Sequence, residues 1–145
     1  MQKLLFIILV ASGINAFSQG TQKDVDYNDL WRRGPEKIYY LLPDTVHPYT
    51  GKCHLYFPKT KKVAVSGQFI DGLKTGEWKW VYKDGKTKRT TEYKKGMKHG
   101  KTTYYYKNGN KKSEINFYMD KNIKQVSWNE KGQRIENPSF HQFKN

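Results

Sequence analysis

The sequence predicts an all-β protein, an elongated antiparallel meander of repeated β-hairpins that is largely single-layered. A period of about 24 residues supports this prediction, because residues 71–85 recur as residues 95–109 with every glycine kept. Self-similarity at a fixed period of about 20–50 residues is typical of stacked-repeat architectures. Aromatic and other side chains alternate over Glu77–Lys83, and Asp84-Gly85 follows, which indicates a strand and a tight hairpin turn. The same turn returns one period later as Asn108-Gly109.

The first eighteen residues predict a secretory signal peptide. Lys3 supplies a positive charge, Leu4–Val10 is an unbroken apolar run, and cleavage after Ser18 places Ala16 two residues before the last residue removed. The apolar run is far shorter than the about 20 residues that span a bilayer. We therefore expect residues 1–18 to be removed and the protein to be exported, periplasmic or extracellular, and not membrane-spanning.

Residues 19–48 are expected to form an N-terminal segment with one short strand. Ile38–Leu42 is apolar and rich in residues that favour strands, and Pro43-Asp44 stops it. Leu30–Pro35 is expected to form a short turn or a helix end, with Trp31 packed on the first repeat.

The repeat domain is expected to span residues 49–135, with two well-matched copies between two weaker ones, followed by a polar tail over residues 136–145. One face of its sheet is expected to carry an aromatic ladder, because residues two apart in a strand share a face. A single sheet leaves this ladder open on one side unless curvature, the N-terminal segment or a partner covers it. The ladder comprises Leu55, Trp80, Tyr104 and Trp128, flanked by Phe57, Tyr82 and Tyr106 and by Phe69, Tyr93 and Phe117.

The sequence shows no catalytic or metal-binding pattern. Cys53 and His54 are adjacent in a predicted strand, so their side chains point to opposite faces and cannot act as a nucleophile–base pair. Cys53 holds the repeat position of Trp78 and is expected to fill the core. The histidines lack metal-ligand spacing, and the carboxylates form no acid–base pair. We therefore expect neither enzymatic activity nor a bound cofactor or metal.

Basic residues are concentrated in the repeats. The chain has a formal net charge of +14, and residues 72–112 hold thirteen Lys or Arg against three acidic residues. Such a field attracts anionic partners, but lysines on exposed strands also prevent sheets from pairing edge to edge. We expect the lysines to lie at turns or on the face away from the aromatics. A solvated surface and an anion-binding surface both remain open.

The glycine and aromatic spacing resembles a known repeat. Gly72-x-x-x-Gly76 with Asp84-Gly85, and Gly96-x-x-x-Gly100 with Asn108-Gly109, are similar to the MORN repeat, and more closely to its bacterial variant in proteins labelled YwqK-like antitoxins. The resemblance covers roughly residues 49–132. It implies a β-hairpin repeat fold used for protein contacts, oligomerisation or lipid contact, and it carries over no catalytic residue. The antitoxin label implies neutralisation of a cytosolic toxin, against which the signal peptide argues.

The leading hypothesis is therefore a non-enzymatic, exported repeat module that docks a protein partner or associates with itself. An alternative is a basic surface that binds anionic envelope glycans or lipid head groups; an exported protein meets these before nucleic acid. A third hypothesis is an antitoxin-like neutralising protein. The candidate partner-binding face comprises Trp78, Trp80, Tyr82, Tyr104 and Tyr106. The candidate anion-binding residues are Lys79, Lys83, Lys101 and Lys107.

Overall fold

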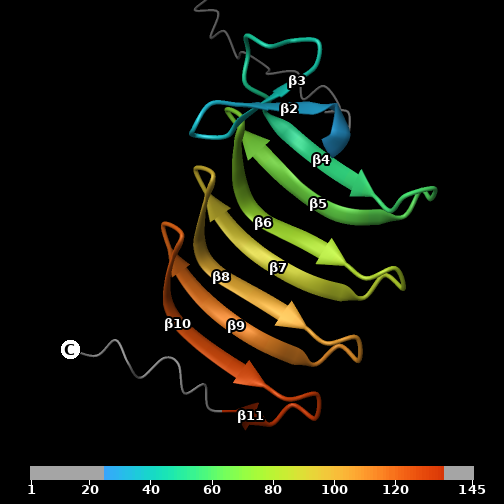
Figure 1. Cartoon of the computed structure of the whole chain (residues 1–145), viewed down its shortest axis with the longest axis vertical. Helices are drawn as coiled ribbons and strands as arrows, with labels where there is room; N and C mark the ends of the chain where they lie inside the picture. The colour runs from blue at the N-terminus through green and yellow to red at the C-terminus, as the bar shows by residue number, and fades with distance from the viewer. Residues whose placement is uncertain (1–24, 136–145) are drawn as a thin grey trace, which may run out of the picture.

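The computed structural model describes residues 25–135, so the predicted signal peptide (1–18) and tail (136–145) lie outside the described residues (Figure 1). The described chain forms a nine-stranded sheet and a separate two-stranded sheet. The predicted all-β meander of sequential hairpins is confirmed. The strands of the large sheet are β1 (Val25–Asp26), β4 (Gly51–Tyr56), β5 (Val63–Ile70), β6 (Leu73–Val81), β7 (Thr87–Lys94), β8 (Met97–Tyr105), β9 (Lys111–Tyr118), β10 (Lys121–Trp128) and β11 (Arg134–Ile135). The second sheet pairs β2 (Leu30–Arg33) with β3 (Ile38–Leu41).

Strand order in the large sheet follows the chain. Each strand from β4 to β11 pairs antiparallel with the next, and β1 adds to the free edge of β4 in parallel. A single 3-10 turn, η1 (Tyr27–Asp29), is the one helical element in residues 25–135 and joins β1 to β2. Local pairing of this kind arises because hairpin turns connect neighbouring strands directly.

Glycines at one end of the sheet make the hairpin turns. Gly85 and Gly109 have φ of 87° and 94°, a left-handed region that glycine enters without steric cost. The backbone N–H of Gly85 donates to Tyr82 O at 2.9 Å, and that of Gly109 donates to Tyr106 O at 3.0 Å. The two turn dipeptides predicted from the sequence are therefore confirmed, and they lie one period apart.

At the other end of the sheet, each hairpin bonds to the hairpin before it. The N–H of Gly96 donates to Lys74 O, and the N–H of Asp120 donates to Lys98 O, at 2.9 Å in both cases. Both the donors and the acceptors are 24 residues apart. The period in the sequence therefore corresponds to a period of hydrogen bonds between neighbouring hairpins.

Tyrosine hydroxyls join the hairpins at the end that carries the glycine turns. Tyr82 Oη donates to Tyr105 O at 2.9 Å, and Tyr106 Oη donates to Trp128 O at the same distance. Because each phenol satisfies a carbonyl of the next hairpin, these two predicted ladder residues stabilise the stack itself.

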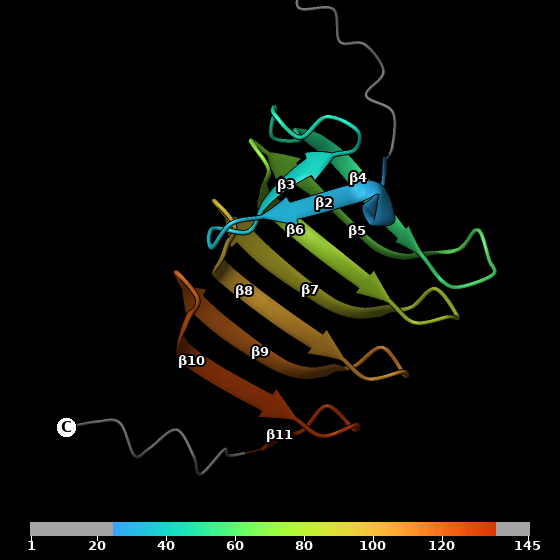
Figure 2. The ribbon, with the colours of Figure 1, turned by 45° about the horizontal axis from the view of Figure 1, so that its top comes forward.

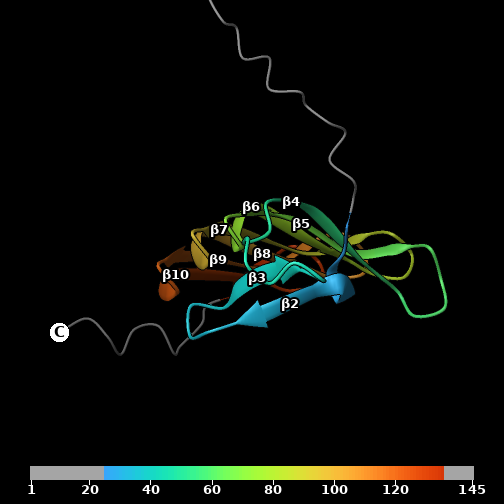
Figure 3. The same cartoon turned by 90° about the horizontal axis from the view of Figure 1, so that it is seen from above.

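The β2–β3 hairpin forms a second layer over the first strands of the sheet. Figure 2 shows it crossing in front of β4–β6, and Figure 3 shows it to one side of the sheet. The N–H of Tyr39 donates to Gly72 O at 2.9 Å, and the N–H of Gly72 donates to Tyr49 O at 2.8 Å. The predicted strand at 38–42 is confirmed as β3, which ends at Leu41. The N-terminal segment thus covers part of the face that a single sheet leaves open.

Leu30–Arg33 is a strand, where the sequence predicted a turn or a helix end. Its hairpin partner is β3, with Leu30 opposite Leu41. Trp31 was expected to pack on the first repeat, but it is 41% exposed and lies beside Tyr40, with 6.1 Å between ring centroids. The expectation for Trp31 was wrong because β2 turns this side chain away from the core.

The core lies between the β2–β3 hairpin and the large sheet. Its buried apolar residues are Tyr49, Cys53, Phe69 and Trp78. The indole of Trp78 lies over Gly67, where a Cβ would overlap the ring atoms, and its Nε1 donates to Gln68 O at 3.3 Å. Phe69 meets Trp78 edge-on at 5.1 Å, a favourable aromatic geometry. Aromatic packing therefore takes the place of an aliphatic core.

Candidate functional site

The large sheet has two distinct faces. We call the face that carries Trp78 the aromatic face and the one that carries Lys79 the opposite face. Strand register extends the aromatic face from Trp78 to Thr91 and Thr102, both buried, with Thr102 Oγ1 and Thr91 Oγ1 3.2 Å apart. A second row on the same face runs from Trp80 through Arg89 to Tyr104.

Trp128 does not belong to the aromatic ladder. Register places Ser113 opposite both Tyr104 and Ser127, so Ser127 and not Trp128 continues the row. Trp128 therefore lies on the opposite face, where the Lys111 ammonium is 5.8 Å from its ring centroid.

The change of face has a cause in the sequence. Around Gly100, strand β8 has two more residues than regular pairing with β7 needs. Because side chains alternate between the faces every second residue, an insertion of two leaves the later side chains of β8 on their expected faces. In β10 only Ile123 is extra opposite β9, and Lys124 stands where β8 has Gly100. A shift of one residue moves every later side chain of the strand to the other face.

The five aromatic residues of the candidate partner-binding face differ in exposure. Trp78 is 1% exposed, so it is not accessible to a partner in this structure. Trp80 and Tyr104 are half-buried on the aromatic face, while Tyr82 and Tyr106 are half-buried and bond to neighbouring hairpins. Among these five residues, Trp80 and Tyr104 lie in one row across the sheet, and Arg89 lies between them.

Cations lie over the aromatic rings, which corrects the expected separation of lysines from aromatics. The guanidinium of Arg89 is 3.6 Å from the Trp80 centroid and 5.8 Å from the Tyr104 centroid. The ammonium of Lys98 is 4.8 Å from the Phe117 centroid. Such contacts contribute about 0.5–2 kcal/mol each, depending on desolvation. The aromatic face is thus also a cationic face.

Lys74 occupies an aromatic cage on the same face. Its ammonium lies 4.3 Å from the Trp78 centroid, and rings of Tyr27, Tyr39 and Tyr93 are within 6.0 Å. Burial lowers the pKa of Lys74, and the positive charges of Arg89, Arg32 and Lys37 lower it further. Sequence alternation could have found Lys74, because it is an even number of residues from Trp78.

The four lysines proposed to bind anions do not form one cluster. Lys79 and Lys101 are exposed on the opposite face, and Lys101 Nζ lies 3.8 Å from Glu114 Oε1. Lys83 and Lys107 are exposed in successive hairpin turns. Lys79 and Lys83 line a shared groove near Phe57, but the other two lie one repeat further along.

Cys53 is in the core, as the sequence predicted. Its side chain is 1% exposed, and burial raises the pKa of the thiol to about 12. Because the thiolate is the reactive form, we expect no modification by a thiol reagent at neutral pH in the native protein. Full modification is expected once denaturant unfolds the chain, and mass spectrometry measures both. Rapid labelling of the native protein would contradict the buried position.

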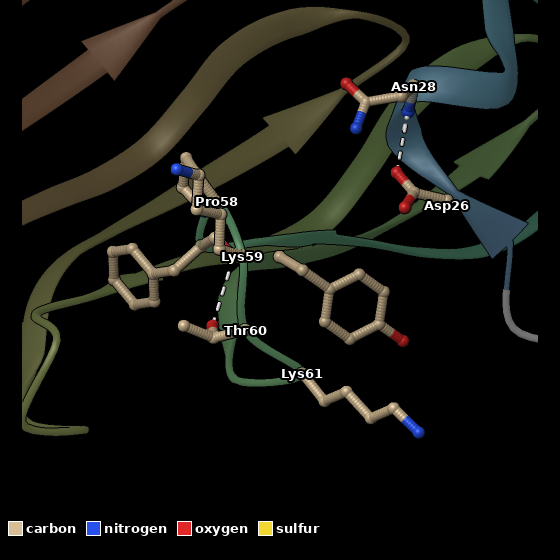
Figure 4. A pocket seen from close by; sticks show the side chains of 8 residues that line it. Asp26, Asn28, Pro58, Lys59, Thr60 and Lys61 are labelled. Carbon is tan, nitrogen blue, oxygen red and sulfur yellow. Dashed lines mark hydrogen bonds between the residues drawn. The ribbon is translucent and has the colours of Figure 1, made fainter.

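A shallow pocket lies between η1 and the β4–β5 turn. Figure 4 shows that Asp26 and Asn28 form one side, and that the turn residues Pro58, Lys59, Thr60 and Lys61 form the other. The Asp26 carboxylate accepts from the backbone N–H of Asn28 at 2.9 Å. The pocket wall brings no nucleophile and base together, so we assign it no chemistry.

Residues 25–135 contain no group of three or more His, Cys, Asp or Glu side chains that could hold a metal ion. Within the same residues, no helix has the length and apolar character needed to cross a membrane. Comparisons of the chain with protein-family models, with curated proteins and with solved structures find no match. The resemblance to MORN-type repeats therefore rests on the repeat residues of this chain alone.

Proposed function

We propose that this protein is a non-enzymatic, exported interaction module that docks a protein partner on its aromatic face. The observation that carries the proposal is that the β2–β3 hairpin covers only part of the aromatic face. It covers β4–β6, and its turn reaches only the beginning of β8, so within residues 25–135 no second layer lies over the rest of β8 and β9 (Figures 2 and 3). The covered half shows what this face accepts, namely an extended β-hairpin.

Side chains on the uncovered part suit a protein partner. Tyr104 and Phe117 lie there, with Arg89 of β7 beside Tyr104 and the Lys98 ammonium over Phe117, and all four are half-buried. Tyrosine and arginine are enriched among the residues that contribute most to protein interfaces. A partner that supplies a carboxylate to Arg89 and an apolar side chain to Tyr104 satisfies both groups.

Export and the repeat resemblance are consistent with this proposal. The sequence pattern of residues 1–18 favours a signal peptide, and MORN-type units serve protein contacts. An antitoxin-like role requires a cytosolic partner and therefore a chain that keeps these residues. Self-association and binding of anionic glycans or lipid head groups are the other outcomes that the following test distinguishes.

An affinity capture from envelope extract tests the proposal. The processed protein is immobilised, and retained material is compared at low and high salt. We expect one discrete protein to remain at high salt, to be lost with the variant Arg89→Ala combined with Tyr104→Ala, and to be kept with Lys79→Ala on the opposite face. Thermal melting checks that all variants fold.

Other results would assign other functions. Retention of polyanions alone, released as salt rises, would contradict a protein partner, since charge-only binding is screened by salt. Retention of the protein's own chain, supported by light scattering, would indicate self-association. A captured protein that binds equally to the double variant and to the native protein would exclude the uncovered aromatic face as the docking surface.

A further inference from the structure

A basic pocket lies where the β2–β3 turn meets the beginnings of β6 and β8. Figure 2 shows this turn beside the edge of the sheet where these two strands begin. The pocket has a volume of about 250 Å³, several times the about 30 Å³ that one water occupies in the liquid. Its lining residues are Arg32, Glu36, Lys37, Tyr39, Lys74, Tyr93, Gly96, Lys98 and Asp120.

The pocket carries excess positive charge. Four cations, Arg32, Lys37, Lys74 and Lys98, line it against the two carboxylates of Glu36 and Asp120. None of these cations forms an ion pair with another residue of the described chain. One Asp120 oxygen already accepts the backbone N–H of Lys98 at 2.9 Å. The formal charge on the pocket wall is therefore +2, without pairing inside the wall.

Lys74 shows that the described part of the chain compensates this charge poorly. Its ammonium is enclosed by aromatic rings and is repelled by Arg32, Lys37 and Arg89. Like charges that lie close together in a concave and partly desolvated pocket repel one another, and an anion bound between them lowers their electrostatic energy. Aromatic rings reduce this cost but supply no counter-ion.

We propose that this pocket binds a phosphate group. A phosphate monoester or inorganic phosphate carries a charge of about −1.5 to −2 at neutral pH, which matches the +2 of the wall. Its oxygens accept hydrogen bonds from ammonium groups, and the planar guanidinium of Arg32 can donate two parallel hydrogen bonds to them. A single carboxylate neutralises only half of the wall charge. The inference goes beyond the protein partner proposed above, since a small anion suffices for it, although Lys98 belongs to both surfaces.

Calorimetric titration of the full protein with inorganic phosphate tests the pocket. Acetate at matched ionic strength is the monoanionic comparison. We expect saturable phosphate binding, weaker binding of acetate, and an increase of about tenfold in Kd for Arg32→Ala and for Lys98→Ala. Lys83→Ala removes the same charge from a distant turn and is the matched control, with Kd unchanged. Lys74 is avoided as the test position because its ammonium packs against the ring of the core residue Trp78.

Two results would overturn the proposal. One is the absence of saturable phosphate binding by the native protein at millimolar concentrations. The other is equal weakening by Lys83→Ala and Arg32→Ala, which would indicate attraction by the overall charge and no defined site. Circular dichroism of each variant excludes loss of fold as the cause.

A second arm identifies the source of the phosphate. The protein is mixed with a soluble phosphate monoester or with phosphatidylcholine vesicles that contain phosphatidic acid. Vesicle flotation that depends on Arg32 and Lys98 would indicate a lipid head group. Binding of the soluble monoester without flotation would indicate a free phosphate ligand. Either result supports the pocket, whereas flotation unaffected by both variants would exclude it as the lipid site.

Discussion

Trp78→Ala is expected to lower the free energy of unfolding by about 3–5 kcal/mol, the usual cost of removing a large buried aromatic side chain. The indole is 1% exposed, lies over Gly67 and contacts Phe69, so its loss leaves a cavity at the centre of the core. Domains are stable by only about 5–15 kcal/mol, and the variant would lose a large part of that. Urea denaturation followed by circular dichroism measures the change.

Trp80→Ala is the matched control for this prediction. It removes the same side chain two residues away on the same face, but Trp80 is half-buried and the guanidinium of Arg89 covers it. We expect a smaller loss of stability, because less apolar surface leaves water when this ring packs. Equal losses at the two positions would show that the core is not centred on Trp78.

Gly72→Ala is expected to destabilise the protein by about 2–5 kcal/mol, from a strained backbone and a steric clash together. Gly72 has a φ of 71°, and an added Cβ would lie 2.5 Å from Ile38 Cγ2 and 2.7 Å from Tyr39 O. The methyl group would therefore push the β2–β3 hairpin away from the sheet and expose the core. Thermal and urea unfolding measure the loss.

Gly76→Ala separates the two contributions. Gly76 has a similar φ of 63°, but nothing lies within 4 Å of the Cβ position. We expect this variant to lose only the backbone term, about 1–2 kcal/mol. If Gly72→Ala and Gly76→Ala proved equally stable, the close contact between Gly72 and the hairpin would be refuted.

Local signals in the sequence predicted most of the repeat sheet. Asp84-Gly85 and Asn108-Gly109 set the turns, and the alternation around Trp80 set the faces of the adjoining strands. Burial of Cys53 followed from its place in the repeat. These features depend on neighbours within one or two hairpins, which is the range over which a periodic sequence carries information.

Features that depend on contacts between distant segments were missed. Strand β2 has no alternating pattern of its own, and its pairing with β3 depends on the turn after Arg33. The face of Trp128 depends on a single extra residue at Ile123. The cation over Trp80 could have been found, because Arg89 shares its strand face with Thr91 and Tyr93. The basic pocket could not, since the β2–β3 turn reaches it only in the folded chain.

The repeating hydrogen bonds between hairpins have a consequence for the history of this chain. The bond from Gly96 to Lys74 and the bond from Asp120 to Lys98 each join one hairpin only to the one before it. These hydrogen bonds do not depend on how many hairpins the sheet contains. A duplication of 24 residues such as 86–109 would therefore add one hairpin. The strands beneath β2 and β3 would keep the same neighbours. Gene duplication can therefore lengthen this protein in whole units, and single substitutions such as Lys124 in place of glycine can then give the last unit a surface of its own.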